Sequence, residues 1–296
     1  MYSISDLERL SGIQSHTIRM WEQRYQALTP KRSAGNTRYY DDQQLIRLLN
    51  IVTVSQQQRL KISQICSLSD EDMHSLINQE IALTAGRDPS YEFYISQLLT
   101  HGIAYDEAGF SELLSACIKQ YGLRDSYLEV IYPLLTRVGL MWQKESVCAA
   151  QEHFLTNIIR QKIFVAIDAL PVASASAKTW VLFLPEEEEH ETGLLLSSFL
   201  LRQSGHRVIY LGGRVPFESL KLAIGANRVD RLLFFISQSK TVGETEVFVE
   251  GLAGMYRTMT TYISGSAKLI SSLRLPNNII WLKSLEELET ILRPAL

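Results

Sequence analysis

The sequence EEHETG, residues 188–193, lies between two apolar runs, residues 180–184 before it and residues 194–196 after it. A short apolar run, a polar turn and a second apolar run are typical of a strand, loop and helix in an α/β unit, which places His190 at the carboxyl end of a strand. Open α/β sheets bind their ligands at that edge. A neutral imidazole can ligate a transition metal, and a carboxylate two residues earlier, here Glu188, can accept the other ring N–H and fix the tautomer. The alternative is a solvated acidic turn, residues 186–191, that holds an incidental histidine.

The segments that follow continue the α/β pattern. We expect a helix over residues 194–202, further strands over residues 208–211, 232–236 and 260–263, and a closing strand and helix over residues 279–289. The chain after residue 178 is therefore predicted to be a Rossmann-like (flavodoxin-like) domain.

The pattern E-x-H-x-x-G resembles the cobalamin-binding motif of corrinoid proteins. The resemblance implies that His190 is the lower axial ligand of cobalt in place of the cofactor's own benzimidazole. It also implies roles in cofactor binding for Glu188, Gly193, Ser237 and Gly265, with Ser237 against the buried nucleotide tail. Many cobalamin domains carry two glycines where this chain has Ser264-Gly265, so Ser264 departs from the family pattern.

A second group of residues lies upstream. Trp142 is separated by nine residues from Glu152-His153, a spacing that resembles the helical cap of light-sensing cobalamin-dependent repressors of the CarH type. That resemblance implies that Trp142 packs over the upper face of the corrin, beside an adenosyl group, and that Glu152 and His153 line the same pocket. The alternative for each residue singly is a core tryptophan and a surface dipeptide.

In those light sensors the residue after the tryptophan is a histidine that captures cobalt after light breaks the cobalt–carbon bond, whereas this chain has Gln143. An amide is a poorer ligand for cobalt than imidazole. We therefore do not expect the two-histidine photoproduct at this position, and His153 or His101 would substitute only with suitable geometry.

The amino terminus has the rhythm of a helix-turn-helix, with helices near residues 3–8 and 15–22 separated by a turn at Gly12. The residues beyond it resemble the wing of the mercury-resistance-regulator (MerR) family, whose pattern is R-x-W-x-x-R-Y followed by P-x-R and R-x-Y. The matching residues are Arg19, Trp21, Arg24, Tyr25, Pro30, Arg32, Arg38 and Tyr40. The resemblance implies binding of double-stranded DNA, with the second helix in the major groove.

We assign Arg19, Arg24, Arg32 and Arg38 to phosphates or groove edges, and His16, Thr17 and Arg19 to base reading. Tyr39 of the wing is included among the DNA-contacting residues, whereas Trp21 and Tyr25 are expected to pack in the small domain. Charge supports this assignment, because residues 1–65 hold nine Lys/Arg against five Asp/Glu in a chain of net charge −3.

Composition and the spacing of apolar residues indicate the domain organisation. The chain has 296 residues, of which 46% are hydrophobic, which is enough for two or three cores. Apolar residues recur every three or four positions between residues 91 and 170, which predicts a four-helix bundle. We expect a winged helix-turn-helix domain at residues 1–75, the helical bundle as a cobalamin cap at residues 90–171, and the Rossmann-like domain at residues 178–296.

No membrane span or signal sequence is expected, so the predicted location is cytoplasmic. Cys66, Cys117 and Cys148 lack the spacing of a disulfide framework or zinc site and are expected to be buried apolar residues.

Three functions fit these features. The first is a DNA-binding transcription regulator, a repressor by resemblance and not an enzyme, controlled by cobalamin (the adenosyl form is favoured) and acting as a dimer or tetramer, with light as a further signal. The second is a regulator of the same architecture that has lost cobalamin. The third is a corrinoid enzyme subunit, which the winged segment disfavours.

Overall fold

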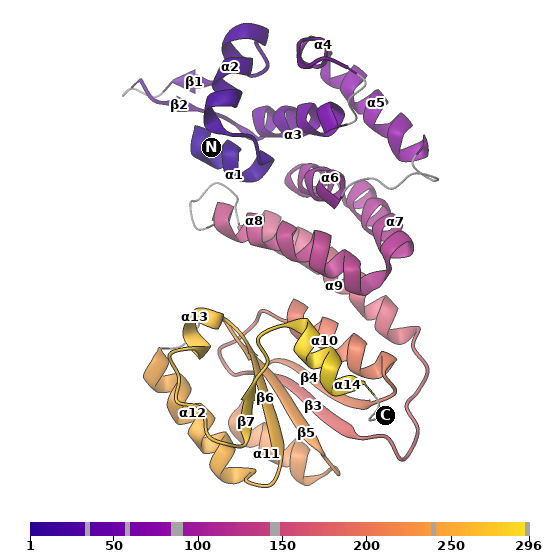
Figure 1. Ribbon diagram of the computed structural model, residues 1–296, viewed down its shortest axis with the longest axis vertical. Coiled ribbons are helices and arrows are strands. Elements are labelled where there is room, and N and C mark those ends of the chain that lie inside the picture. Colours follow the sequence, from indigo (N-terminus) through magenta and orange to yellow (C-terminus); the bar gives the residue numbers. More distant parts are fainter. Residues whose placement is uncertain (33–35, 57–59, 84–90, 143–148, 238–240, 294–296) are drawn as a thin grey trace. The chain divides into compact units, whose positions relative to one another are not determined.

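The computed structural model describes residues 1–296 apart from residues 33–35, 57–59, 84–90, 143–148, 238–240 and 294–296. The chain forms two compact units, Met1–Ile159 and Arg160–Leu296, and each is described by itself (Figure 1). The division falls inside one helix, α9 (Ala149–Asp168). The three-domain division expected from the sequence stays a prediction.

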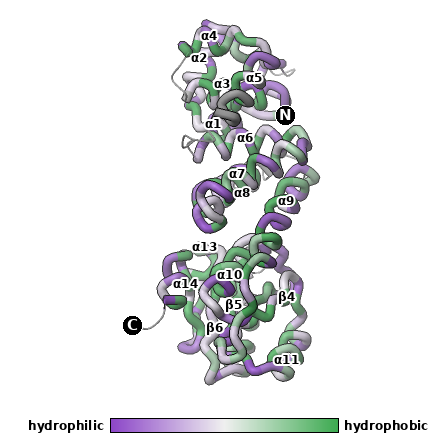
Figure 2. The backbone as a smooth tube through the Cα atoms, turned by 90° about the vertical axis from the view of Figure 1, so that its right-hand side faces the viewer, coloured by the Kyte–Doolittle hydropathy of each residue, from purple (hydrophilic) through white to green (hydrophobic). Residues whose placement is uncertain are grey.

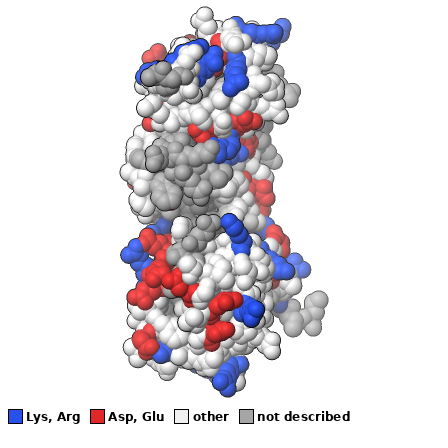
Figure 3. All heavy atoms as spheres, turned by 90° about the vertical axis from the view of Figure 1, so that its left-hand side faces the viewer, with Lys and Arg blue, Asp and Glu red and all other residues white. Residues whose placement is uncertain are grey.

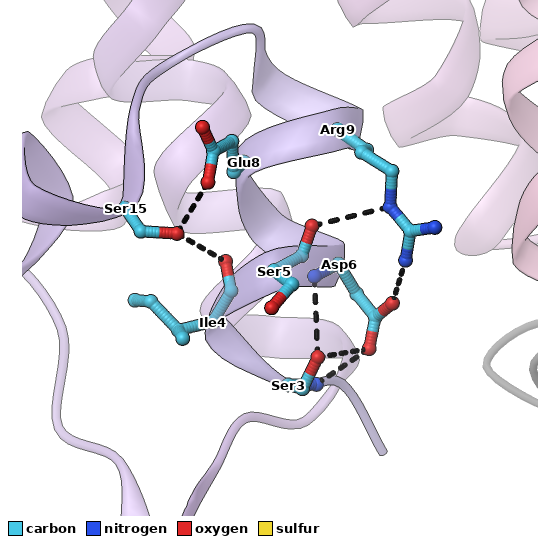
Figure 4. Close-up of polar contacts among 7 residues, drawn as sticks. All are labelled: Ser3, Ile4, Ser5, Asp6, Glu8, Arg9 and Ser15. Atoms are coloured by element: carbon cyan, nitrogen blue, oxygen red, sulfur yellow. Dashed lines mark hydrogen bonds and ion pairs between the residues drawn. The ribbon is translucent and has the colours of Figure 1, made fainter.

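The chain begins with two helices and a small antiparallel ladder: α1 (Ile4–Ser11), α2 (Ser15–Tyr25), β1 (Lys31–Arg32) and β2 (Arg38–Tyr39). Helix α1 starts where it does because Ser3 and Asp6 form a capping box, each side chain accepting a hydrogen bond from the other residue's backbone N–H (Figure 4). It ends at Gly12, whose φ of 72° suits glycine. The Ser15 hydroxyl donates to the Glu8 carboxylate and lies 3.5 Å from the Ile4 carbonyl oxygen, and these contacts join α2 to α1 (Figure 4). The helix-turn-helix and wing predicted from the sequence are confirmed.

Three helices complete this part of the first unit: α3 (Asp42–Gln56), α4 (Ile62–Cys66) and α5 (Asp70–Leu83). Arg47 holds them together. Its guanidinium donates to the carbonyls of Ala27 (2.9 Å), Cys66 (3.0 Å) and Leu68 (3.2 Å), and it also pairs with Asp70. Arg47 thus contributes to the positive charge of the segment, but its N–H groups donate hydrogen bonds within the protein.

The helical part contains α6 (Tyr91–Ile103), α7 (Glu107–Ser126), a π-helical turn η2 (Tyr127–Ile131), α8 (Tyr132–Trp142) and the first part of α9. The predicted apolar face is largely buried, including Leu113, Leu114 and Cys117. Phe164 is an exception at 43% exposure, and its ring meets that of Tyr210 edge-on. Among the described helices, none combines the length and apolar character needed to cross a membrane.

A five-stranded parallel sheet forms the centre of the second unit, with strand order β4-β3-β5-β6-β7. The strands are β3 (Thr179–Pro185), β4 (Arg207–Val215), β5 (Arg231–Ile236), β6 (Thr260–Gly265) and β7 (Ile279–Trp281). The helices are α10 (Thr192–Gln203), α11 (Phe217–Gly225), α12 (Val242–Met255), α13 (Ala267–Ile270) and α14 (Leu285–Leu292). This alternation confirms the Rossmann-like fold.

The strand order places the predicted site. Every residue of β3 is buried, as expected for a central strand covered on both faces. Figure 2 colours the backbone by hydropathy and shows hydrophobic (green) stretches among the elements of the α/β part. The chain leaves β3 toward β4 on one side of it and later returns to form β5 on the other side, so the gap between β3 and β5 is the topological switch point. Ligands of open α/β sheets bind at the carboxyl ends of strands at such a point. His190 follows β3, and Ser237 follows β5.

Candidate functional site

Glu188 and His190 are in direct contact in the loop between β3 and α10. Atom Nδ1 of His190 lies 2.5 Å from Oε1 of Glu188. The Glu188 side chain is 2% exposed, whereas that of His190 is 77% exposed. The carboxylate is therefore part of the protein interior, and the imidazole stands on the surface. The alternative of a solvated acidic turn is wrong for Glu188.

The Glu188 carboxylate is held from two strand ends. Oε1 also accepts the backbone N–H groups of Glu189 (3.0 Å) and His190 (3.1 Å), and Oε2 accepts both the N–H and the hydroxyl of Ser237, each at 2.6 Å. Burial alone would raise the pKa of Glu188, but the hydrogen bonds from His190 and Ser237 outweigh it and lower the pKa to about 2. An ionised carboxylate only accepts hydrogen bonds, so His190 donates from Nδ1, which in the neutral imidazole leaves the lone pair on Nε2.

The next residue of the motif, Glu191, holds the loop to two other elements. It accepts the Gly213 N–H of β4 at 2.6 Å, and its other oxygen pairs with Arg160 of α9. Burial and the nearby Glu191 charge raise the pKa of Tyr210, which lies beside this pair on β4. Glu191 therefore fixes the loop that carries His190 against both the edge strand and α9.

Two glycines at this edge sit where a side chain has no room. A Cβ atom at Gly193 would lie 2.9 Å from the ring of Phe235. Gly265 has a φ of 120°, and a Cβ atom there would lie 2.1 Å from the Ile236 carbonyl oxygen. Gly265 is thus required for the close approach of the ends of β5 and β6. Its neighbour Ser264 donates its hydroxyl to the Leu282 carbonyl at 2.9 Å.

These residues fit a cobalt corrinoid held through one imidazole. His190 is exposed at the carboxyl edge of the sheet, and its tautomer is set by a buried ionised partner. Among the described residues no cluster of three or more His, Cys, Asp or Glu side chains could hold a metal ion. One imidazole nitrogen, such as that of His190, is enough for a metal that brings its own equatorial ring.

The residues expected at the upper face belong to the first unit. Trp142 ends α8, but its side chain and Gln143 lie outside the described residues. Glu152 and His153 stand in the first turn of α9, where Oε2 of Glu152 lies 2.9 Å from Nδ1 of His153. His153 is 71% exposed, whereas His101 pairs with the α7 cap residue Asp106 at 2.7 Å. A pocket shared by these residues and His190 stays a prediction.

The predicted base-reading residues lie on α2, the second helix of the helix-turn-helix and the expected recognition helix. His16 and Arg19 are exposed, and Arg24 is exposed near the end of the helix. The buried face of α2 instead presents Ile18 and Trp21, which confirms the expectation that Trp21 is a packing residue. The exposed side of the helix thus carries basic and polar side chains, whereas its apolar side is buried in the protein core.

The wing carries the remaining predicted DNA contacts. Arg32 is exposed and donates to the side chain of Asn36 at 2.6 Å, and Tyr39 is half-buried. Arg38 differs from expectation in one respect, because its Nε lies 3.3 Å from the largely buried carboxylate of Glu22 on α2. Lys and Arg side chains gather around the winged segment in Figure 3. This distribution agrees with the positive charge counted for residues 1–65.

Three residues important to these sites were not found from the sequence. Arg160 and Glu191 meet across 31 positions, and Glu22 contacts the wing from a different element. Glu191 lies inside the motif, which was a usable signal. Arg160 and Glu22 had no signal of their own, because their contacts depend on the tertiary fold.

Comparison with known proteins identifies the family. The description "MerR HTH family regulatory protein" matches residues 2–71, and "B12 binding domain" matches residues 94–166. The HTH-type transcriptional repressor CarH of Myxococcus xanthus is 30% identical over 269 residues, covering 90% of this chain and 89% of CarH. The chain belongs to the CarH family. The HTH-type transcriptional repressor CarA of the same organism is 26% identical over 228 residues, covering 77% of this chain and 73% of CarA.

This CarH-family protein is accordingly a cobalamin-dependent DNA-binding regulator and not an enzyme. The third function considered from the sequence, a corrinoid enzyme subunit, is therefore wrong. Among solved structures, the monomethylamine corrinoid protein of Methanosarcina barkeri is similar, with a TM-score of 0.51 and 14% identity over 68% of this chain and 98% of that one. At that identity the likeness shows a common fold.

Proposed function

We propose that this CarH-family protein represses transcription and that adenosylcobalamin, bound through His190, controls its affinity for DNA. The observation that carries the proposal is the contact between Glu188 and His190. It presents one exposed imidazole with its outer nitrogen as the ligand atom, at the switch point of the sheet.

The residues have distinct parts in this proposal. His190 supplies the lower ligand from Nε2, Glu188 orients the ring through Nδ1, and Ser237 holds Glu188. We also place Gly193 and Gly265 at the cofactor site, at an edge of the sheet where neither position has room for a side chain. When bound, adenosylcobalamin supplies an upper cobalt–carbon bond that light can break. We assign Trp142, Glu152 and His153 to the protection of that upper side.

DNA binding is proposed to be controlled through the association of several copies of the chain. A cofactor shared by the helical part and the α/β part would hold both in an arrangement that favours dimers or tetramers. Several winged segments would then engage repeated DNA sites, and binding of one would raise the effective concentration of the next. His16, Thr17, Arg19, Arg24, Arg32, Arg38 and Tyr39 are the proposed DNA contacts.

A mobility-shift assay tests this function. The probe is a duplex selected from random-sequence DNA by the wild-type protein loaded with adenosylcobalamin in the dark. We expect the loaded protein to bind this duplex more tightly than the cofactor-free protein. Equal affinity with and without the cofactor would contradict control by cobalamin, and failure to select any duplex would contradict DNA binding.

A further inference from the structure

The recognition helix and the wing meet at one largely buried carboxylate, that of Glu22. The Glu22 side chain is 8% exposed. Its Oε2 accepts a hydrogen bond from the Tyr40 hydroxyl at 2.8 Å, and its Oε1 lies 3.3 Å from Nε of Arg38. A buried charge is costly unless it is paired and hydrogen-bonded. Both oxygens of Glu22 meet that requirement with residues in or directly after the second wing strand.

The wing needs such an attachment because its own ladder is short. Over the described residues of the wing, strands β1 and β2 contain two residues each, and they pair as Lys31 with Tyr39 and Arg32 with Arg38. A two-stranded hairpin is at best marginally stable alone. Contacts with the helices, such as those of Glu22, therefore contribute to the orientation of the wing.

Tyr40 provides one end of that attachment. Its backbone pairs with Tyr2 through two hydrogen bonds of 2.7 and 2.9 Å, and its side chain is 1% exposed. Burial and the contact with Glu22 raise the pKa of the Tyr40 hydroxyl, so it is a protonated donor at neutral pH. Tyr40 thus links Tyr2, just before α1, to Glu22 on α2.

Arg38 provides the other end. Its side chain is 35% exposed, and Glu22 engages it through Nε. A guanidinium has five N–H donors, so its terminal nitrogens can serve a phosphate while Nε is held. A held guanidinium loses less conformational entropy on binding than a mobile one.

We propose that Glu22 is a positioning residue for DNA binding, which sets the wing against the recognition helix and aims the Arg38 guanidinium at the DNA backbone. Glu22 itself does not contact DNA in this proposal, because its carboxylate is buried and would repel phosphate. The inference rests on the DNA-binding function of the winged segment. In this proposal DNA binding by the winged segment depends on one acidic residue, Glu22, as well as on the basic residues that contact the DNA.

The test compares Glu22→Gln with the matched control Glu71→Gln in the full-length protein. Glu71 is an exposed acid in the first turn of α5, away from the wing contacts described above. Both substitutions remove one negative charge, which by simple electrostatics should strengthen DNA binding slightly. We expect Glu22→Gln instead to weaken binding of the selected duplex about tenfold, in the range for losing a hydrogen bond to a charged group. Glu71→Gln should show only the slight strengthening.

Two further readouts separate positioning from general destabilisation. Loss of an Arg38–phosphate contact should reduce the slope of log affinity against log salt by about one unit. Hydroxyl-radical footprinting should lose the protection given by the wing and keep that given by α2. In an Arg38→Ala background, Glu22→Gln should have little additional effect, since the residue it positions is gone.

Unchanged affinity, salt slope and footprint in a folded Glu22→Gln protein would overturn the inference. If that variant fails to fold, Tyr40→Phe decides instead, because it removes only the hydroxyl that reaches Glu22. Full wing protection in Tyr40→Phe would then overturn it. A wild-type protein that binds no DNA would instead reject the function itself.

Discussion

Oε1 of Glu188 lies 2.5 Å from Nδ1 of His190, while Oε2 of the same carboxylate accepts two hydrogen bonds from Ser237. One buried acid thus connects the loop after β3 with the end of β5. This arrangement orients an exposed imidazole without using the nitrogen that faces away from the protein. The cofactor predictions below follow from it.

Replacing Glu188 with Gln should weaken cobalamin binding about 10- to 100-fold, the usual range for a partner of a metal-bound histidine. The amide keeps the size of the side chain but loses the charge that fixes the tautomer of His190. Titration of the visible spectrum with cobalamin measures the affinity. Glu186→Gln is the control, since Glu186 is exposed and two residues away. Equal affinity of the two variants would show that the buried carboxylate has no part in binding.

Gly265→Ala should destabilise the α/β unit by about 1–3 kcal/mol, because alanine at this φ is strained and its Cβ would meet the Ile236 carbonyl. Gly254→Ala in α12 is the opposite case. It has no atom within 4 Å of the added Cβ and should stabilise the fold by about 0.5–1 kcal/mol. Urea denaturation of the cofactor-free protein measures both. A Gly265→Ala protein as stable as wild type would mean that β5 and β6 do not approach as described.

Arg19→Ala should weaken DNA binding about tenfold or more without changing cobalamin uptake. Arg19 is exposed on the recognition helix, whereas the candidate cofactor ligand lies in the other unit. Arg228→Ala removes an exposed cation from the second unit and serves as the control. If both variants lose affinity equally, overall charge rather than the recognition helix governs binding.

Illumination should lower the oligomeric mass of the protein loaded with adenosylcobalamin, as measured by size-exclusion chromatography. Breaking the cobalt–carbon bond removes the upper group that is proposed to hold the parts together. With Gln143 after Trp142, the resulting spectrum should lack the features of two-histidine coordination. An unchanged mass after illumination would remove light sensing from the proposed function.

Local patterns predicted the parts of the site that depend on neighbouring residues. The Glu188–His190 contact follows from a spacing of two positions in a loop, and the central strands follow from continuous apolar runs. The placement of Ser237 at the same edge followed from the parallel sheet. Its hydrogen bonds to Glu188, rather than to a cofactor tail, were not predicted, since they depend on how closely β3 and β5 end together.

Contacts between distant elements could not be predicted. Arg160 lies on a helix whose apolar spacing indicated only a bundle, and its pairing with Glu191 depends on the tertiary fold of the second unit, to which both residues belong. Arg38 was expected to face DNA alone, but the folding of the wing onto α2 brings it to Glu22. Side-chain charge is visible in a sequence, whereas the partner that neutralises it is not.

The most direct test of cobalt ligation by His190 is the visible spectrum of protein mixed with adenosylcobalamin in the dark and then desalted. We expect wild type and the control His206→Gln, whose histidine precedes β4 at the opposite edge of the sheet, to retain the cofactor with one spectrum. His190→Ala should lose most of it or show a shifted base-coordination band. Equal retention and an identical spectrum in His190→Ala would contradict the account.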